Sequence, residues 1–174
     1  MTFPSQWNSH MTAQLHLSLT SGSWIEVKDG NPAVAALYDR HYSRNRNAVG
    51  DPRFAGPGEK LVLVTPCERA AIVLRKFRSL DTTASPDDIN VAIFRNEGAG
   101  QSSVLIREAI EHARRRWPAA VRFYTYVNDR RILSPNPGYC FKCAGWRTCG
   151  RTKTRKLTIL EWRVDWAEPL PLAA

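Results

Sequence analysis

A loop with two glycines separates an apolar run from a long helical pattern in the middle of this chain of 174 residues. The loop and the helix start read Arg95-Asn96-Glu97-Gly98-Ala99-Gly100-Gln101-Ser102-Ser103. Backbone N–H groups and the helix dipole attract anions at a helix start, and glycines let anion oxygens approach closely. The pattern predicts an anion site, such as a cradle for a cofactor pyrophosphate, with Ser102 and Ser103 capping the helix. The alternative is a plain strand-to-helix turn, which the acid Glu97 favours.

Candidate proton-transfer groups follow the first predicted helix, in the segment His41-Tyr42-Ser43. An imidazole titrates near neutrality and a phenol can relay protons, so His41 could act as a base and Tyr42 as a proton donor. Ser43 is counted with them as a candidate catalytic residue. The structural alternative is that His41 interacts with the helix dipole and Tyr42 packs. Tyr139 is a further candidate proton donor.

The chain is strongly basic, with 25 Lys and Arg against 16 Asp and Glu and a net charge of +9. This charge favours polyanionic partners or anionic cofactors. The stretch 142–156 is rich in Lys and Arg and contains no acid, which suits phosphate contacts, although a solvated basic face is the alternative. Tyr124 and Tyr126 share one face of a predicted strand and could stack on a base or simply pack. The predicted nucleic-acid contacts are Arg44, Arg46, Arg147, Arg151, Lys153 and Arg155.

Three of the four cysteines lie close together in sequence, at Cys140, Cys143 and Cys149. Three soft ligands could form a small zinc site with a fourth ligand from elsewhere. The chain has no second Cys-x-x-Cys pair, however, and His112 falls within a predicted helix. We therefore expect reduced, buried thiols and no metal.

Length and composition indicate one globular domain, because 43% of the residues are apolar and no run approaches the ~20 apolar residues of a membrane span. We expect a lead-in segment at residues 1–22, the domain at 23–166 and a Pro-rich tail at 167–174. The first residues lack the basic start and apolar core of a secretory signal. The expected location is the cytoplasm, without membrane contact.

The candidate groups depend on elements that the hydrophobic pattern predicts. Asn31 is the expected cap of the first helix, with Pro32 in its first turn. Two apolar runs flank a turn-like segment and predict an antiparallel hairpin. The predicted order is strand 23–30, helix 31–43, hairpin 60–65 and 69–77, strand 89–95, helix 105–117, strand 120–128, short helix 139–146 and strand 156–164.

The strand, glycine loop and helix resemble the signature of the GNAT superfamily of acyl-CoA-dependent acyltransferases, Arg/Gln-x-x-Gly-x-Gly/Ala, which Arg95, Gly98 and Gly100 match. The resemblance covers residues 23 to 163 and implies an α/β fold, a mixed central sheet flanked by helices. It implies acetyl-CoA or another acyl-CoA as cofactor, with the pyrophosphate on the amides of residues 98–103. The pantetheine arm would pair with residues 91–94, and the strand split near Phe94 and Tyr124 would receive the thioester. The implied cofactor-binding residues are Ile93, Phe94, Arg95, Gly98, Ala99, Gly100, Gln101, Ser102 and Ser103.

Two further resemblances concern the chemistry. The segment 141–146 resembles the family's Tyr-x-x-x-Gly-Phe, but Phe141 stands where many members carry the tyrosine that protonates the CoA thiolate. That role passes to Tyr139 or another group, or is absent. The segment His41-Tyr42-Ser43-Arg44 resembles the Mom-type DNA-modification proteins of phages, which are GNAT-like. This implies modification of an adenine amino group in DNA, in the host cytoplasm if a phage encodes the protein.

We therefore expect an acyl-CoA-dependent N-acyltransferase in which a neutral amine attacks the thioester directly. The protein would position the reactants, hydrogen-bond the carbonyl and accept a proton. The expected partners are an acyl-CoA and DNA. The rival hypothesis is a non-catalytic nucleic-acid-binding module built around the basic, Cys-containing C-terminal segment.

Overall fold

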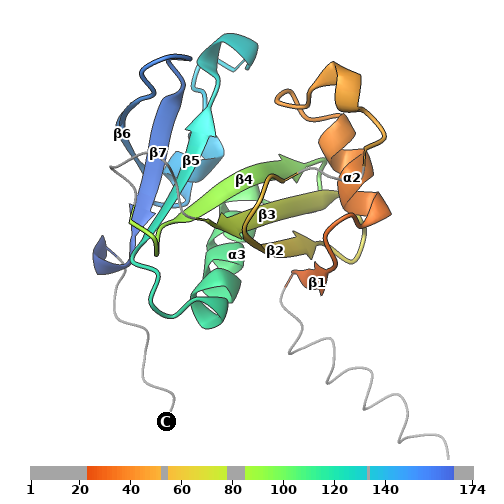
Figure 1. Cartoon of the computed structure of the whole chain (residues 1–174), viewed down its shortest axis with the longest axis horizontal. Helices are drawn as coiled ribbons and strands as arrows, with labels where there is room; N and C mark the ends of the chain where they lie inside the picture. Colours follow the sequence, from red (N-terminus) through yellow and green to blue (C-terminus); the bar gives the residue numbers. More distant parts are fainter. Residues whose placement is uncertain (1–22, 52–54, 78–84, 133, 167–174) are drawn as a thin grey trace, which may run out of the picture.

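The computed structural model describes residues 23–51, 55–77, 85–132 and 134–166, so the predicted lead-in segment 1–22 and tail 167–174 lie outside the described residues. The described residues form a mixed sheet of seven strands in the order β1-β2-β3-β4-β5-β7-β6 (Figure 1). The strands are β1 (Ile25–Val27), β2 (Glu59–Val64), β3 (Ala70–Lys76), β4 (Ile89–Asn96), β5 (Arg122–Val127), β6 (Arg147–Arg151) and β7 (Thr158–Arg163). The helices are α2 (Pro32–Asp39), α3 (Ser102–Arg116) and α4 (Tyr139–Cys143), with 3₁₀ turns η1 (Arg46–Ala48), η2 (Asp129–Arg131) and η3 (Val164–Trp166).

Two apolar layers cover the two faces of the sheet. The alternation along β2 and β3 sends Leu61 and Leu63 to one face and Val62 and Val64 to the other. The first face packs against α3 and α4, and the second packs against α2. The predicted hairpin is confirmed, since β2 and β3 pair antiparallel along their whole length.

The parallel pair β4 and β5 determines where the sheet opens. Only Ile89–Val91 pair with Phe123–Thr125, and beyond this point the two strands diverge (Figure 1). A parallel pair requires a crossover, which α3 supplies. The separation therefore begins after Val91 and Thr125 and extends towards the carboxyl ends of β4 and β5.

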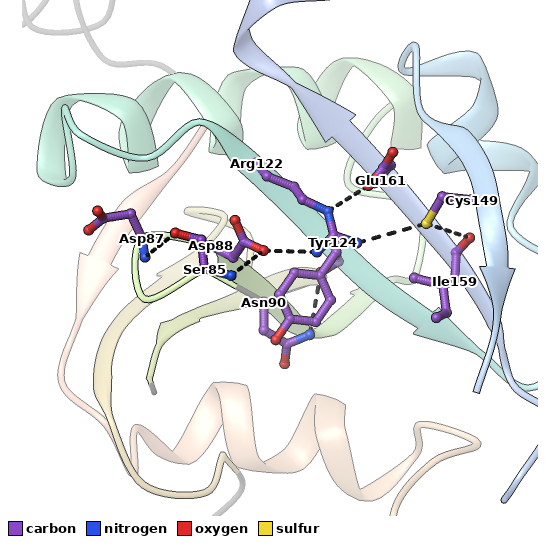
Figure 2. A network of polar contacts seen from close by, with 9 residues as sticks. All are labelled: Ser85, Asp87, Asp88, Asn90, Arg122, Tyr124, Cys149, Ile159 and Glu161. Carbon is purple, nitrogen blue, oxygen red and sulfur yellow. Dashed lines mark hydrogen bonds and ion pairs between the residues drawn. The ribbon is translucent and has the colours of Figure 1, made fainter. Parts of the chain in front are cut away.

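A network of polar contacts joins β4, β5 and β7 at the opposite end of the pair (Figure 2). The Arg122 guanidinium donates to Asp88 Oδ2 at 2.8 Å and to Glu161 Oε2 at 2.5 Å. The Asn90 amide donates to the Tyr124 carbonyl at 3.3 Å. These contacts fix the closed end, so the divergence is confined to the other end.

The secondary structure differs from the sequence analysis in three places. The first helix ends at Asp39, so His41 and Tyr42 lie in the following turn and not on the helix. Ser102 and Ser103 are the first helical residues of α3, while the cap position is held by Gln101, which makes no side-chain cap bond. The third difference is strand β6, which the sequence analysis missed; its residues are all exposed and lack apolar alternation.

Candidate active site

A cavity of about 1170 Å³ lies where β4 and β5 diverge. Its walls come from the segment after α2, β4, β5, the turn that follows β5, α4 and the β6–β7 turn. The cavity thus brings together residues 41–45 and 138–141, which are far apart in sequence. Pockets of this size accept a cofactor or substrate of several rings.

A β-bulge shapes the β4 wall of the cavity. Val73 pairs with Ile93 and Leu74 pairs with Val91, so Ala92 is the extra residue and has no partner on β3. Ala92 and Phe94 line the cavity. Ile93, predicted to bind the cofactor, instead buries its side chain in the layer under α2, so only its backbone remains available.

The glycine loop is folded around the side chain of Asn96. Asn96 Oδ1 accepts the N–H groups of Gly98 at 3.0 Å and Ala99 at 2.9 Å, and its amide donates to the Gly100 carbonyl and the Ser102 hydroxyl. Two of the amides predicted to hold a pyrophosphate are therefore already bonded. The first turn of α3 keeps N–H groups without intrahelical acceptors, as every helix start does. The N–H groups that remain for the predicted anion site are therefore those at the helix start.

Glu97 is neutralised by arginines. Arg40 binds its carboxylate with two hydrogen bonds of 2.9 Å, and Arg95 adds one of 3.0 Å. The bond from Arg40 is the main reason that the Glu97 pKa falls to about 2, and Arg95 contributes to the shift. The Arg69 guanidinium donates to the Glu97 carbonyl at 2.7 and 3.0 Å. An acid in the loop is thus compatible with an anion site.

The His41 imidazole is held neutral at the rim of the cavity. Its Nδ1 lies 2.8 Å from the Ser43 hydroxyl and accepts the Ser43 N–H at 3.2 Å. Burial lowers the His41 pKa to about 4, with a further contribution from Arg95, against a hydrogen bond to the Phe94 backbone. At neutral pH such a group is a weak proton acceptor. The geometry favours positioning of the segment 41–43 against β4 over a role as a strong general base.

Three protonated groups line the cavity near α4. Tyr42 stacks on His41 with ring centroids 4.4 Å apart, and burial raises its pKa. Tyr139 is 60% exposed, and a hydrogen bond with Cys143 raises its pKa. Burial also raises the pKa of Cys140, a half-buried thiol that the sequence analysis did not predict as a site residue. Each can donate a proton at neutral pH.

Phe141 fills the space beside these donors. It is buried and packs edge-on against Phe94 and Trp146, at centroid distances of 5.8 and 4.9 Å. Its ring therefore belongs to the core while also bordering the cavity. Phe141 has no hydroxyl and cannot protonate a departing thiolate. Any proton donor must therefore be one of the neighbouring residues.

Exposed basic residues line one part of the cavity, which we call the cavity mouth. Four exposed cations from two loops contribute to its lining, namely Arg130, Arg131, Arg155 and Lys156. Of these, only Arg155 was among the predicted nucleic-acid contacts. Arg130 and Arg131 follow shortly after the strand 122–127, and Lys156 lies in the turn before the strand 158–163. These positions in the sequence could have indicated the three residues. These four side chains add positive charge to the cavity lining.

The other predicted nucleic-acid contacts are more scattered. Arg44 is buried and donates to Asp39 at 2.8 Å and to two loop carbonyls, so its guanidinium already has partners within the protein, although the residue also lines the cavity. Arg147 lies over the Trp166 ring at 4.4 Å, and Arg151 pairs with Asp129 at 2.7 Å. Arg46 and Lys153 are exposed.

The cysteines form no metal cluster in the part of the chain that the structure describes, where no group of three or more His, Cys, Asp or Glu could hold an ion. All four thiols are free, but the expectation that the three clustered thiols are buried is wrong for Cys143 and Cys149, which are exposed. Among the described helices, none has the length and apolar character needed to cross a bilayer.

No protein-family model and no curated protein sequence matches the chain. Solved structures match its fold. The aminoglycoside acetyltransferase AAC(6')-Ib in complex with coenzyme A has a TM-score of 0.58 at 10% identity, over 83% of this chain and 96% of that chain. An aminoglycoside 6'-acetyltransferase of type Ii has a TM-score of 0.54 at 11% identity, over 85% and 99%. The ribosomal-protein-S18-alanine N-acetyltransferase from Escherichia coli has a TM-score of 0.50 at 11% identity, over 81% and 92%.

The fold is that of the GNAT acetyltransferases. The predicted fold class, a mixed central sheet flanked by helices, is therefore confirmed. The names of these GNAT proteins refer to two different acceptors, an aminoglycoside and a protein alanine, so the fold leaves the acceptor open. The expected split near Tyr124 lies one step further along the strand, because Tyr124 is buried and within the paired segment.

Proposed function

We propose that the protein is an acyl-CoA-dependent N-acyltransferase. The observation that carries the proposal is the divergence of β4 and β5 after Val91 and Thr125, which opens into a large cavity, while β4 itself continues through the glycine loop into α3. A pantetheine arm fits along the free edge of β4, and a pyrophosphate fits at the helix start. One protein of similar fold, AAC(6')-Ib, is named in two structures as a complex with coenzyme A and with acetyl-CoA, which supports this cofactor.

The chemical step needs little beyond positioning. The nitrogen lone pair of a neutral amine attacks the thioester carbonyl, the C–N bond forms, and the C–S bond breaks to release the CoA thiolate. The backbone at Ala92, which the bulge removes from pairing with β3, supplies hydrogen-bonding groups at the point where negative charge develops on the carbonyl oxygen. The amine loses a proton and the thiolate gains one.

The proton donors suit the departing thiolate. Tyr42, Tyr139 and Cys140 are protonated at neutral pH and line the cavity. Any of them replaces the missing hydroxyl at Phe141. Tyr42 is more buried than Tyr139, so its hydroxyl proton is better shielded from solvent.

We further propose that the acceptor is an amino group of a nucleic-acid base, with DNA as the nucleic acid. The four cations at the cavity mouth suit phosphates on either side of a nucleotide that has entered the cavity. Tyr126, 39% exposed, lines the cavity and offers a ring for stacking. A paired base must be extruded, or a single strand used, for its amino group to reach the thioester.

The weak basicity of His41 supports this acceptor over an alkyl amine. An alkyl ammonium group must lose a proton before it can attack, which calls for a base that titrates near neutrality. The amino group of a nucleobase is already neutral. An imidazole whose pKa is about 4 is poorly suited to deprotonating an ammonium group before attack. A nucleobase amine loses its proton only as its nitrogen becomes positively charged during attack, when a weak base suffices.

Two measurements test these proposals. Calorimetric titration with acetyl-CoA tests the cofactor, and we expect saturable binding that desulfo- or free CoA also shows. Incubation with acetyl-CoA and DNA, followed by nucleoside mass spectrometry, tests the acceptor, with an aminoglycoside and a peptide amine as parallel substrates. Acylation of a small or peptide amine without an acylated nucleoside would refute the DNA acceptor alone. DNA binding without any CoA binding would refute the acyltransferase and support the non-catalytic rival.

A further inference from the structure

Three arginines from three different segments converge on Glu97. Arg40 follows α2, Arg69 lies in the turn between β2 and β3, and Arg95 is the last residue but one of β4. Together with the carboxylate they leave two positive charges at the exposed side of the glycine loop, since three guanidinium groups face one acid. We call Arg40, Arg69 and Arg95 the arginine cluster.

The arginine cluster keeps spare donors. A guanidinium has five N–H donors, and the Glu97 carboxylate takes only two from Arg40. The Arg40 side chain is 52% exposed, and that of Arg95 is 34% exposed. An exposed carboxylate bound by two arginines contributes little to stability. The cluster therefore has the donors, the charge and the access to bind a more highly charged oxyanion.

We propose that the arginine cluster binds the 3'-phosphate of CoA, so that the protein selects CoA over carriers that lack this group. This inference rests on the proposed function, because it requires that the cofactor lies on the glycine loop. Glu97 occupies the cluster in the free protein as an internal counter-ion. A phosphate monoester carries up to two negative charges and accepts bidentate bonds from arginine, so it competes with a single carboxylate.

The position of the cluster distinguishes it from the pyrophosphate site. The pyrophosphate site lies at the start of α3, after Gly100, where the helix N–H groups point outward. The cluster lies before Gly98, on the side of the loop that faces β3 and α2. With the pyrophosphate at the helix start and the pantetheine arm along the free edge of β4, the phosphorylated ribose is the part of CoA that remains to bind the cluster.

The test compares CoA with 3'-dephospho-CoA by calorimetry on four proteins. The wild type should bind CoA about tenfold or more tightly than 3'-dephospho-CoA, as expected for charge-assisted bonds to a phosphate. In Arg40→Ala and Arg69→Ala this ratio should fall towards one, while binding of 3'-dephospho-CoA stays near its wild-type value. Arg115→Ala, an exposed arginine at the far end of α3, is the matched control and should keep the wild-type ratio.

A second variant protects the test against misfolding. Glu97→Gln removes the competing charge, so it should tighten CoA binding several-fold relative to the wild type and change 3'-dephospho-CoA binding less. A misfolded variant would not bind CoA more tightly than the wild type does. An unchanged ratio in Arg40→Ala and Arg69→Ala, with both ligands bound by the wild type, would overturn this inference alone. Failure of the wild type to bind either ligand would overturn the proposed function itself.

Discussion

The Thr125 hydroxyl donates to the Val91 carbonyl at 2.9 Å, at the last residue pair before β4 and β5 separate. Thr125 is buried. Its side-chain hydrogen bond joins β5 to β4 at the last residue pair, beyond which the two strands do not pair with each other. The opening of the sheet therefore has a defined apex. On the cavity side of this apex, β4 and β5 no longer pair with each other. On the other side, strand pairing and the Arg122 network join them.

Replacement Thr125→Val tests this apex. Valine has the shape of threonine without the hydroxyl, so the Val91 carbonyl loses a buried partner, and the free energy of unfolding should fall by about 1–2 kcal/mol. Thr125→Ser retains the hydroxyl and serves as the control. Chemical denaturation of both variants gives the comparison. Equal stability of Thr125→Val and the wild type would mean that the hydrogen bond does not hold the apex.

The pKa of His41 leads to a prediction on pH. Its folded pKa of about 4 lies below the ordinary value of 6.5, so the folded state favours the neutral ring. The stabilisation is complete above pH 6.5 and is lost as the pH falls towards 4. NMR titration of the ring should show a midpoint near 4, and kcat/KM should show no inflection near 6.5 from this residue. A midpoint near 6.5 would restore His41 as a general base.

The sequence predicted much of the sheet but less of the site, for identifiable physical reasons. Periodicity identified β4 and α3 because their buried residues repeat at strand and helix spacing, as Val91, Ile106 and Ile110 show. Strand β6 has no such repeat, since it is an exposed edge that pairs only with β7. Local propensity also cannot show that Arg44 is buried, because its partners are Asp39 and carbonyls of a loop.

The cavity residues were harder to predict than the glycine loop. Gly98 and Gly100 belong to one short contiguous motif, whereas the cavity depends on contacts between distant segments. Arg131, for example, donates to the Tyr42 carbonyl across 89 positions of sequence, which places the turn after β5 beside the segment after α2. The pattern of residue types in a single sequence does not show that two segments so far apart in the chain lie side by side. The cavity-lining role of Cys140 and of Arg130 follows only from the assembled fold.

Two glycines with similar backbone angles allow a controlled test of the loop. Gly98 has φ of 88° and Gly50 has φ of 84°, so alanine should destabilise the protein at either position, by about 1 kcal/mol. At Gly98 the new Cβ would lie 2.7 Å from Arg69 Nη2, while at Gly50 it meets no atom within 4 Å. We expect CoA binding to weaken in Gly98→Ala and not in Gly50→Ala. Equal CoA binding by both variants would argue against a cofactor on this loop.

The basic cavity mouth should make DNA binding depend steeply on salt. For duplex DNA the log–log slope of affinity against salt changes by about 0.9 for each phosphate neutralised. Charge reversal at Arg130 and Arg155 should therefore flatten the slope measured by fluorescence anisotropy. Reversal of Arg115, which lies outside the cavity lining, provides the control and should leave the slope near its wild-type value. An unchanged slope in the double variant would place DNA elsewhere on the protein.

Tyr42 is the proton donor that the geometry favours, and its replacement tests the chemistry of thiolate departure. Tyr42→Phe keeps the ring against His41 but removes the proton, so kcat should fall by about a hundredfold with KM for acyl-CoA little changed. Tyr139→Phe should cost less, because this phenol is mostly exposed and water can replace it. Rates with acyl donors whose leaving thiols are more acidic should recover in Tyr42→Phe, since such thiolates need no proton. A full loss at Tyr139 with normal turnover in Tyr42→Phe would assign the proton to α4 instead.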